Sequence, residues 1–389
     1  MNSSTSWRPS EIIIHSQVRD DPATIFFLQQ SPDVPVKYID SGISTAVVAA
    51  SEILAGCGSG MLDKVIAGKR VVFIAPATQA VDQFTMPDDR MLCPHFDRLK
   101  LASNGCFYQC DWCYLKLTYR ANQPYITIRV QHDEIKRQIQ KRLRESALPI
   151  MFNSGELADS LSLEHLTGAM RAFIPFFGQS GNGYLFLLTK SDNVDCILDL
   201  PHNGHSIVTW SMNNEDVSRK YEIGAPSFER RIEAAYKVQQ AGYPLRVRID
   251  PVVPFDGWQS AYAGTVARIF QKIAPDRITL GTLRFEEGFY KMRRSIFTTG
   301  RELPQMMKKI MPMFEPMIIR GSKKPKVGKY SYTEDKRVEI FDFMIREIRK
   351  HSGCTIALCK ESANVWNQLG MDLSQCRCVC QYDHADMRR

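Results

Sequence analysis

The feature of this sequence that most restricts its fold is the alternation, between about residues 100 and 285, of short apolar runs with longer helix-like segments. Each run is rich in β-branched or large apolar residues and is too short for a buried helix. Strands that alternate with helices favour parallel pairing through right-handed crossovers, and hence an α/β barrel or an open sheet. The clearest helix is expected over 227–242, with Ser227 as its N-cap. The predicted strands lie within residues 98–105, 149–156, 183–190, 206–213, 244–253 and 277–285.

Polar residues follow three of these predicted strands at their C-terminal ends, over 153–156, 189–191 and 211–213. The carboxyl ends of parallel strands meet at one edge of a barrel, and that edge carries the active site in barrels of this type. We therefore expect these polar residues to contribute to one site.

The same alternation sets the expected domain limits. Residues 98–290 are predicted to form a partial (β/α)6 barrel. Residues 1–97 are predicted to form a separate mixed α/β lobe, because residues 46–76 have the pattern of a helix followed by a strand. Residues 291–389 are expected to be a basic and cysteine-rich C-terminal extension.

Three cysteines stand at C-x3-C-x2-C spacing directly after the first predicted strand: Cys106, Cys110 and Cys113. Thiolates are the preferred ligands of iron–sulfur clusters. Three thiolates on a four-iron cluster leave one iron open to another ligand. The alternative is a zinc site, but structural zinc takes four ligands, and His132 lies in another predicted element.

With Trp112 before the third cysteine, the loop resembles that of radical S-adenosylmethionine (radical SAM) enzymes. The resemblance implies a TIM-type radical SAM barrel, a [4Fe-4S] cluster on the three cysteines, and S-adenosyl-L-methionine on the free iron, with Trp112 beside its adenosine. Ser154, Gly155 and Glu156 resemble the element of these enzymes that receives the cofactor's ammonium group. The alternative for Glu156 is a helix cap or a surface ion pair.

Further stretches resemble the spore photoproduct lyase family, which reverts a thymine lesion in DNA. This resemblance implies that Lys190, Ser211 and Asn213 contact the cofactor. It also implies that Lys329, Tyr330 and Tyr332 lie toward the substrate, although the two tyrosines could equally be packed in a hairpin. The matching stretches are 123–135, 162–167, 187–191, 210–213, 224–245, 255–262, 283–289 and 327–332.

One position departs from the family's pattern. By the resemblance, the cysteine that donates a hydrogen atom to the product radical corresponds to Glu156 in this chain. A carboxyl O–H bond is too strong to release a hydrogen atom readily. We therefore expect either another donor, with Tyr114, Tyr330 and Tyr332 as candidates, or another reaction.

The C-terminal segment contains five cysteines within 27 residues: Cys354, Cys359, Cys376, Cys378 and Cys380. This density predicts a second metal ion or cluster. Neighbouring thiols could instead form a redox disulfide or provide the missing hydrogen donor. The remaining alternative is that Cys359 belongs to the core and the tail has no such role.

Charge and composition indicate partners. Residues 284–350 hold 17 Lys and Arg against nine Asp and Glu, a surplus equal to the net charge of +8 of the whole chain. Such a segment favours a DNA or nucleotide substrate, although a solvated lysine-rich surface has the same composition. The radical SAM resemblance further implies a reductant such as flavodoxin or ferredoxin.

No apolar stretch approaches the roughly 20 residues that span a bilayer, and the first residues do not have the pattern of a signal peptide. We therefore expect a cytoplasmic enzyme; the sequence does not predict its oligomeric state. Two other functions remain open. One is a biosynthetic radical SAM enzyme acting on a small molecule or peptide, and the other is a non-catalytic metal-containing protein that binds nucleic acid.

Overall fold

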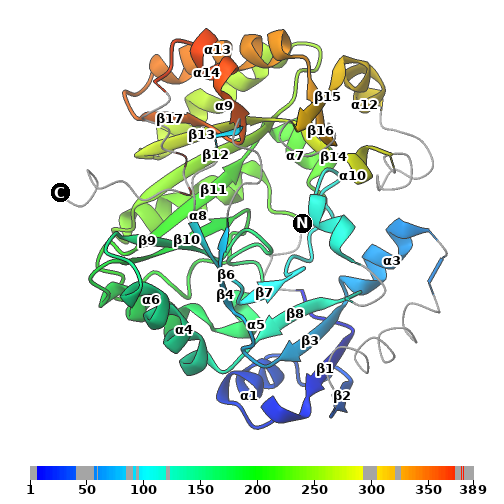
Figure 1. Cartoon of the computed structure of the whole chain (residues 1–389), viewed down its shortest axis with the longest axis vertical. Helices are drawn as coiled ribbons and strands as arrows, with labels where there is room; N and C mark the ends of the chain where they lie inside the picture. The colour runs from blue at the N-terminus through cyan, green and yellow to red at the C-terminus, as the bar shows by residue number, and fades with distance from the viewer. Residues whose placement is uncertain are drawn as a thin grey trace.

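The computed structural model describes residues 7–40, 57–58, 60–84, 91–92, 96–119, 123–291, 305–319 and 326–372, together with Cys378 and Cys380. Within these residues the strands form one large sheet, one five-stranded sheet and two small sheets (Figure 1). No helix in the described ranges combines the length and the apolar character needed to cross a membrane.

The large sheet contains a strand from each of the six predicted strand regions and has the order β17-β13-β12-β11-β10-β9-β6-β4. Its neighbouring strands are parallel except for β4, which is antiparallel to β6. Its strands are β4 (Val81–Phe84), β6 (Phe96–Leu99), β9 (Ile150–Asn153), β10 (Gly183–Thr189), β11 (Ser206–Met212), β12 (Leu245–Val252), β13 (Arg277–Thr282) and β17 (Thr355–Leu358).

The five-stranded sheet has the order β2-β1-β3-β8-β7 and crosses the boundary predicted at residue 97. The first predicted strand, 98–105, is in fact split, because β6 joins the large sheet and β7 joins this one. A strand edge needs hydrogen-bond partners, and β8 supplies them to β3 from the far side of the boundary. The strands are β1 (Glu11–His15), β2 (Val36–Ile39), β3 (Val71–Ala75), β7 (Ala102–Ser103) and β8 (Ile126–Arg129).

The boundary predicted at residue 290 is also crossed, because β17 pairs in parallel with β13 and extends the large sheet. The C-terminal segment is therefore part of the barrel wall. Smaller strands complete this side: β14 (Arg284–Glu286), β15 (Phe314–Ile319) and β16 (Lys326–Tyr332) form one sheet, and β5 (Met91–Leu92) pairs with β18 (Glu361–Ser362).

The helices lie on the outside of the sheets (Figure 1). Ser227 caps α8 as predicted, since its side chain accepts a hydrogen bond from the backbone N–H of Arg230. The α-helices are α1 (Pro22–Gln29), α3 (Met61–Gly68), α4 (His132–Arg144), α5 (Glu164–Thr167), α6 (Met170–Gly178), α7 (Glu215–Tyr221), α8 (Phe228–Gln240), α9 (Trp258–Lys272), α10 (Glu287–Lys291), α12 (Gln305–Ile310), α13 (Glu334–Arg349) and α14 (Ala363–Gln368).

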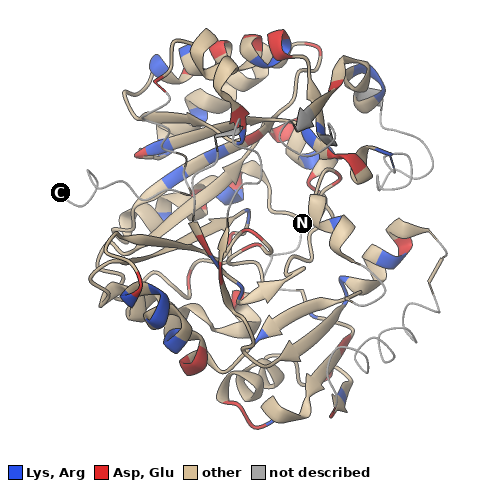
Figure 2. Cartoon of the chain, in the orientation of Figure 1, with Lys and Arg blue, Asp and Glu red and all other residues tan. Residues whose placement is uncertain are grey.

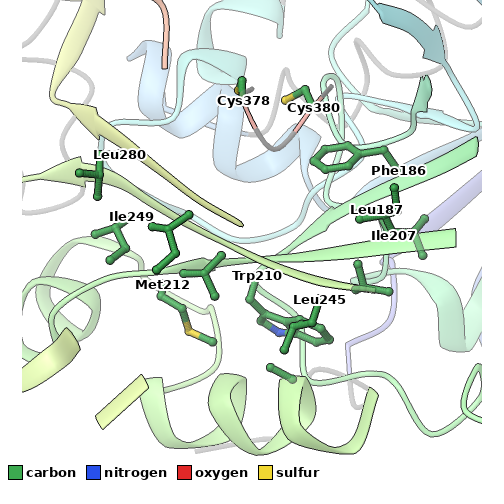
Figure 3. Close-up of a cluster of buried hydrophobic side chains, with 14 of the residues drawn as sticks. Phe186, Leu187, Ile207, Trp210, Met212, Leu245, Ile249, Leu280, Cys378 and Cys380 are labelled. Atoms are coloured by element: carbon green, nitrogen blue, oxygen red, sulfur yellow. The ribbon is translucent and has the colours of Figure 1, made fainter. Parts of the chain in front are cut away.

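The main core lies along the large sheet, whose central strands are covered on both faces, as parallel strands usually are. Every residue of β11 is buried. Figure 3 shows part of this core, in which Trp210 and Met212 lie near Leu245 and Ile249, and in which Cys378 also belongs to the cluster.

Candidate functional site

A cleft of about 550 Å³ opens at the C-terminal ends of the parallel strands. This is the edge where the polar strand ends were expected to meet. The structure brings ten of the predicted site residues together in the wall of this cleft: Cys106, Cys110, Trp112, Cys113, Tyr114, Gly155, Glu156, Lys190, Ser211 and Lys329.

The loop with the three cysteines is held by backbone hydrogen bonds to the end of α7. The N–H of Gln109 donates to Ile223 at 2.8 Å, and the N–H of Asp111 donates to Tyr221 at 2.7 Å. Gly105 starts the loop, where an added Cβ would lie 2.4 Å from the Cβ of Ala102. Glycine is therefore required for the loop to leave β7 in this direction.

Two buried lysines lie under the cysteine loop. Lys116 and Asp111 form an ion pair at 3.6 Å with both side chains fully buried. Lys69, at the end of α3, donates a hydrogen bond to the backbone carbonyl of Tyr108. Ammonium groups in these positions would offset part of the negative charge of three thiolates bound to a cluster.

Burial disfavours the thiolate form of two of these cysteines, Cys106 and Cys110, in the absence of a metal. Burial raises the pKa of Cys110 to about 11, although Lys190 opposes the shift, and burial raises the pKa of Cys106 further. Metal ligation requires thiolates, so a bound cluster would have to displace these protons. Three thiols in one cleft wall, with cations behind them, form a donor set that fits an iron–sulfur cluster.

Lys190 lies at the end of β10 in a network of buried charges. Its Nζ is 3.1 Å from Ser211 Oγ and 3.7 Å from Glu222 Oε1. Burial alone would lower the pKa of Lys190, but Glu222 and Cys110 outweigh it and raise that pKa. Lys190 therefore presents an ammonium group to the cleft, where it can pair with a carboxylate.

Glu222 is in turn held by Arg231, whose Nη1 lies 2.5 Å from Glu222 Oε2 with both side chains almost fully buried. Burial would raise the pKa of Glu222, but Arg231 and Lys190 lower it below the ordinary value. Arg231 also donates to the backbone carbonyl of Ser211 at 3.1 Å. The ion pair thus keeps Glu222 ionised, and Arg231 holds the end of β11 at Ser211 in position.

Gly155 and Glu156 lie in the turn that follows β9. An added Cβ on Gly155 would lie 2.6 Å from the Cβ of Leu188, so the close approach of this turn to β10 requires glycine. Glu156 Oε1 is 3.6 Å from the Nζ of Lys360. Tyr114 donates its hydroxyl hydrogen bond to the backbone carbonyl of Glu156.

Ser154 and Asn213 do not line the cleft. The hydroxyl of Ser154 shares a hydrogen bond with Ser160 at 2.9 Å and lies 3.2 Å from the carbonyl of Phe186. Asn213 donates to the carbonyl of Pro251 at 3.0 Å and accepts from the hydroxyl of Tyr262 at 2.7 Å. Both side chains therefore tie strand ends together instead of facing a ligand.

Tyr330 and Tyr332 of β16 also lie outside the lining of the cleft. Tyr332 is fully buried and meets Phe314 edge-on, with ring centroids 4.9 Å apart. Tyr330 stacks on Tyr290 with centroids 3.9 Å apart. This is the packing that the hairpin alternative anticipated. Of the three candidate hydrogen donors, only Tyr114 lines the cleft.

Several charged residues of the cleft wall were not predicted as site residues. Arg248 and Asp250 come from β12, Arg284 from β14, and Lys360 from the turn after β17. In β12 the charged residues Arg246, Arg248 and Asp250 alternate with apolar residues, and this pattern is a sequence signal that could have identified part of this group.

Three of the tail cysteines are buried beside this wall. Cys378 shares hydrogen bonds with Cys359 and Cys380, and Arg248 Nη2 lies 3.0 Å from Cys359 Sγ. Cys354 is half-buried, and Cys376 lies outside the described residues. In the part of the chain that the structure describes, no three His, Cys, Asp or Glu side chains are grouped as a site for one metal ion.

The basic segment does not form a continuous positive face on α13. Figure 2 shows Lys and Arg interspersed with Asp and Glu along this helix. Arg346 pairs with Asp342 at 2.8 Å, and Lys336 pairs with Glu339 at 2.7 Å. This helix therefore adds nothing to the charge surplus of residues 284–350, most of which belongs to residues outside the described ranges.

Comparison with known proteins places this geometry in context. A family model described as spore photoproduct lyase matches residues 98–354. The chain is 35% identical to the spore photoproduct lyase of Geobacillus sp. (strain Y412MC61) over 187 residues, 47% of this chain and 53% of that protein. It is 36% identical to that of Bacillus subtilis (strain 168) over 172 residues, 44% of this chain and 49% of that protein. The matched segments thus span about half the length of these two relatives.

The fold is similar to that of a solved spore photoproduct lyase complexed with dinucleoside spore photoproduct. The TM-score is 0.74 at 22% identity, and the match covers 90% of this chain and 98% of the other. A mutant of such a lyase with bound AdoMet and dinucleoside spore photoproduct matches with the same TM-score, identity and coverage. The large sheet therefore corresponds to the partial barrel of radical SAM enzymes. The five-stranded sheet and its helices are additional to that barrel.

Proposed function

Because the chain belongs to the spore photoproduct lyase family, a family of radical SAM enzymes, we propose that it cleaves S-adenosylmethionine to act on a pyrimidine lesion in DNA or a nucleotide. The observation that carries this proposal is that Cys106, Cys110 and Cys113 share one cleft with Lys190 and Glu156. The relatives' activity is the source of the proposed substrate, since one solved relative binds dinucleoside spore photoproduct.

In this proposal the three cysteines hold a [4Fe-4S] cluster, and the cleft wall beside them holds S-adenosylmethionine. Bound there, the cluster supplies the electron that breaks the sulfonium bond and so yields the 5'-deoxyadenosyl radical. Lys190 would pair with the cofactor's carboxylate and Glu156 with its ammonium group, because charge-assisted hydrogen bonds are strong in a cleft with little water. Trp112 presents its ring to the same cleft and would pack on the adenosine.

The experiment that tests this function is anaerobic reconstitution with iron and sulfide, followed by incubation with S-adenosylmethionine, a reductant such as flavodoxin or ferredoxin, and DNA containing spore photoproduct. We expect 5'-deoxyadenosine and repaired thymines. A cluster-loaded, reduced sample that forms no 5'-deoxyadenosine would exclude radical chemistry. Formation of 5'-deoxyadenosine without any response to lesion DNA would favour a small-molecule or peptide substrate.

The hydrogen donor to the product radical is a separate part of the proposal. If Glu156 occupies the position of the family's donor cysteine, the chain has no thiol there. Tyr114 is the nearest replacement on chemical grounds, because a phenol O–H bond is weaker than a carboxyl O–H bond and Tyr114 reaches the turn that carries Glu156. A phenol is protonated at neutral pH, so Tyr114 retains the O–H hydrogen that this role needs.

We predict that Tyr114→Phe retains cleavage of S-adenosylmethionine but strongly lowers the yield of repaired thymine, because phenylalanine has no O–H hydrogen atom to transfer to the product radical. Chromatography of 5'-deoxyadenosine and of the repaired dinucleotide from the same reaction measures both. Tyr236→Phe, at a partly buried tyrosine of α8 that does not line the cleft, is the matched control. An unchanged yield of repaired thymine in Tyr114→Phe would remove Tyr114 as the donor.

A further inference from the structure

One carboxylate in the cleft wall, that of Asp250, accepts hydrogen bonds from two guanidinium groups. Asp250 Oδ2 accepts hydrogen bonds from Arg248 Nε at 3.1 Å, from Arg248 Nη2 at 2.6 Å and from Arg284 Nη2 at 2.9 Å. An added Cβ on Gly281 would lie 2.3 Å from the Asp250 Cγ, so glycine at that position leaves the space that this carboxylate occupies. All three charged residues line the cleft.

These contacts do not use all the donors of the two guanidinium groups. Arg284 Nη1 is buried and has no hydrogen-bond partner among the described residues, and its side chain is only 10% exposed. The hydrogen bonds of Arg248 to Asp250 and Cys359 involve Nε and Nη2 only. Buried donors in native proteins are normally satisfied, so an unsatisfied donor in a cleft wall calls for an acceptor on a ligand.

The same wall also holds an excess of positive charge. Lys329 and Lys360 line it beside the two arginines. Lys329 Nζ is 3.0 Å from Glu286, yet burial together with Lys360 and Arg284 lowers the pKa of Lys329. Four cationic side chains in this wall thus face three carboxylates, those of Asp250, Glu286 and Glu156, the last of which pairs with Lys360. A bound anion would balance the remaining positive charge.

We propose that Arg248 and Arg284 form an oxyanion subsite that binds a phosphodiester of the nucleotide substrate. A planar guanidinium group can donate two parallel hydrogen bonds to two oxygens of one phosphate, and Asp250 holds both guanidinium groups in place. The subsite is separate from Lys190, which pairs with Glu222 and is assigned above to the cofactor. The assignment of the anion to a nucleotide rests on the proposed function; the presence of an oxyanion subsite rests on the geometry.

The first test uses inorganic pyrophosphate and the full-length protein. Binding of this anion should raise the pKa of Lys329 and slow its trace acetylation by about fivefold or more, measured by mass spectrometry relative to the exposed Lys64. If pyrophosphate leaves the acetylation of Lys329 unchanged in the wild type, the subsite is overturned.

Two variants locate the effect. Arg284→Lys keeps a positive charge beside Asp250 but loses the second donor arm, and Arg248→Met removes the other guanidinium. Both should lose most of the protection, while Arg137→Met, which removes an exposed arginine of α4, should behave as the wild type does. Circular dichroism verifies that each variant folds. If Arg248→Met does not fold, the test rests on Arg284→Lys, which retains the positive charge. Full protection in a folded Arg284→Lys variant would contradict the assignment.

The second test identifies the source of the anion by comparing dinucleotide spore photoproduct, which has one phosphodiester, with the dinucleoside form, which has none. The wild type should bind the dinucleotide about tenfold more tightly, equivalent to about 1.4 kcal/mol, and Arg284→Lys should lose this preference. Equal binding of the two lesions would overturn the phosphodiester assignment. Failure of both lesions to bind would overturn the proposed substrate, while the pyrophosphate result would still decide whether the subsite exists.

Discussion

Replacing Cys110 with alanine is expected to abolish the bound cluster and, with it, cleavage of S-adenosylmethionine. Cys110 is buried in the loop that α7 holds in place, so no other side chain can take over its position. Loss of an outer-shell partner already costs roughly 10- to 100-fold in metal affinity, and loss of a ligand should cost more. Iron and sulfide analysis after reconstitution, together with the yield of 5'-deoxyadenosine, measures both effects.

The matched control is Cys196→Ala, because Cys196 is another partly buried cysteine but does not line the cleft. It should retain about four irons and four sulfides per chain, as one [4Fe-4S] cluster requires. Four irons in Cys110→Ala would contradict the assignment of the ligands. The same analysis of Cys378→Ser tests the second metal site predicted for the tail: wild-type iron above four that falls to four in this variant would support it.

Replacing Arg231 with leucine is expected to lower the free energy of unfolding by about 3–5 kcal/mol, the usual cost of breaking a buried ion pair by removing one partner. Arg231 and Glu222 are both almost fully buried, and leucine would leave the Glu222 carboxylate with Lys190 as its cationic partner and Ser218 as a hydrogen-bond donor. Urea denaturation followed by circular dichroism measures the change. The variant should also disturb the cleft wall, because Arg231 donates a hydrogen bond to the backbone carbonyl of Ser211, which lines the cleft.

Two further variants distinguish this buried pair from ordinary charge effects. Arg346→Leu breaks an exposed pair on α13 and should cost no more than about 1 kcal/mol. The double variant Arg231→Leu/Glu222→Leu should recover much of the loss, since it removes the unpaired buried charge. Equal destabilisation by Arg231→Leu and Arg346→Leu would show that the buried pair contributes no more than a surface pair.

The pair also predicts a pH dependence. The pKa of Glu222 is lower in the folded protein than its ordinary value of 4.5. A lowered carboxyl pKa contributes stability that is complete above the ordinary value and is lost as the pH falls through the folded value. The stability difference between the wild type and the Arg231→Leu variant should therefore be constant near neutral pH and should shrink in acid. A difference that grows as the pH falls below 4 would contradict this account.

Sequence alone determined those parts of the protein that depend on residues close together in the chain. The C-x3-C-x2-C spacing places three thiols in one short loop, and the loop does line the cleft. Parallel strands present their carboxyl ends at one edge, so Glu156, Lys190 and Ser211 could be expected there from the strand pattern and the family resemblance. The cap of α8 at Ser227 is equally local, because one side chain and a nearby N–H decide it.

Tertiary structure alone decided which side of each strand end a residue faces and which distant segments meet. Ser154 and Asn213 were themselves predicted to contact the cofactor, but in the folded chain their side chains bond to the backbone carbonyls of Phe186 and Pro251. Arg248 meets Cys359 across 111 residues, and β17 pairs with β13 from outside the predicted barrel. Such contacts produce no periodic pattern in the sequence. They form only when strand edges and buried charges from separate segments pair with one another in the folded chain.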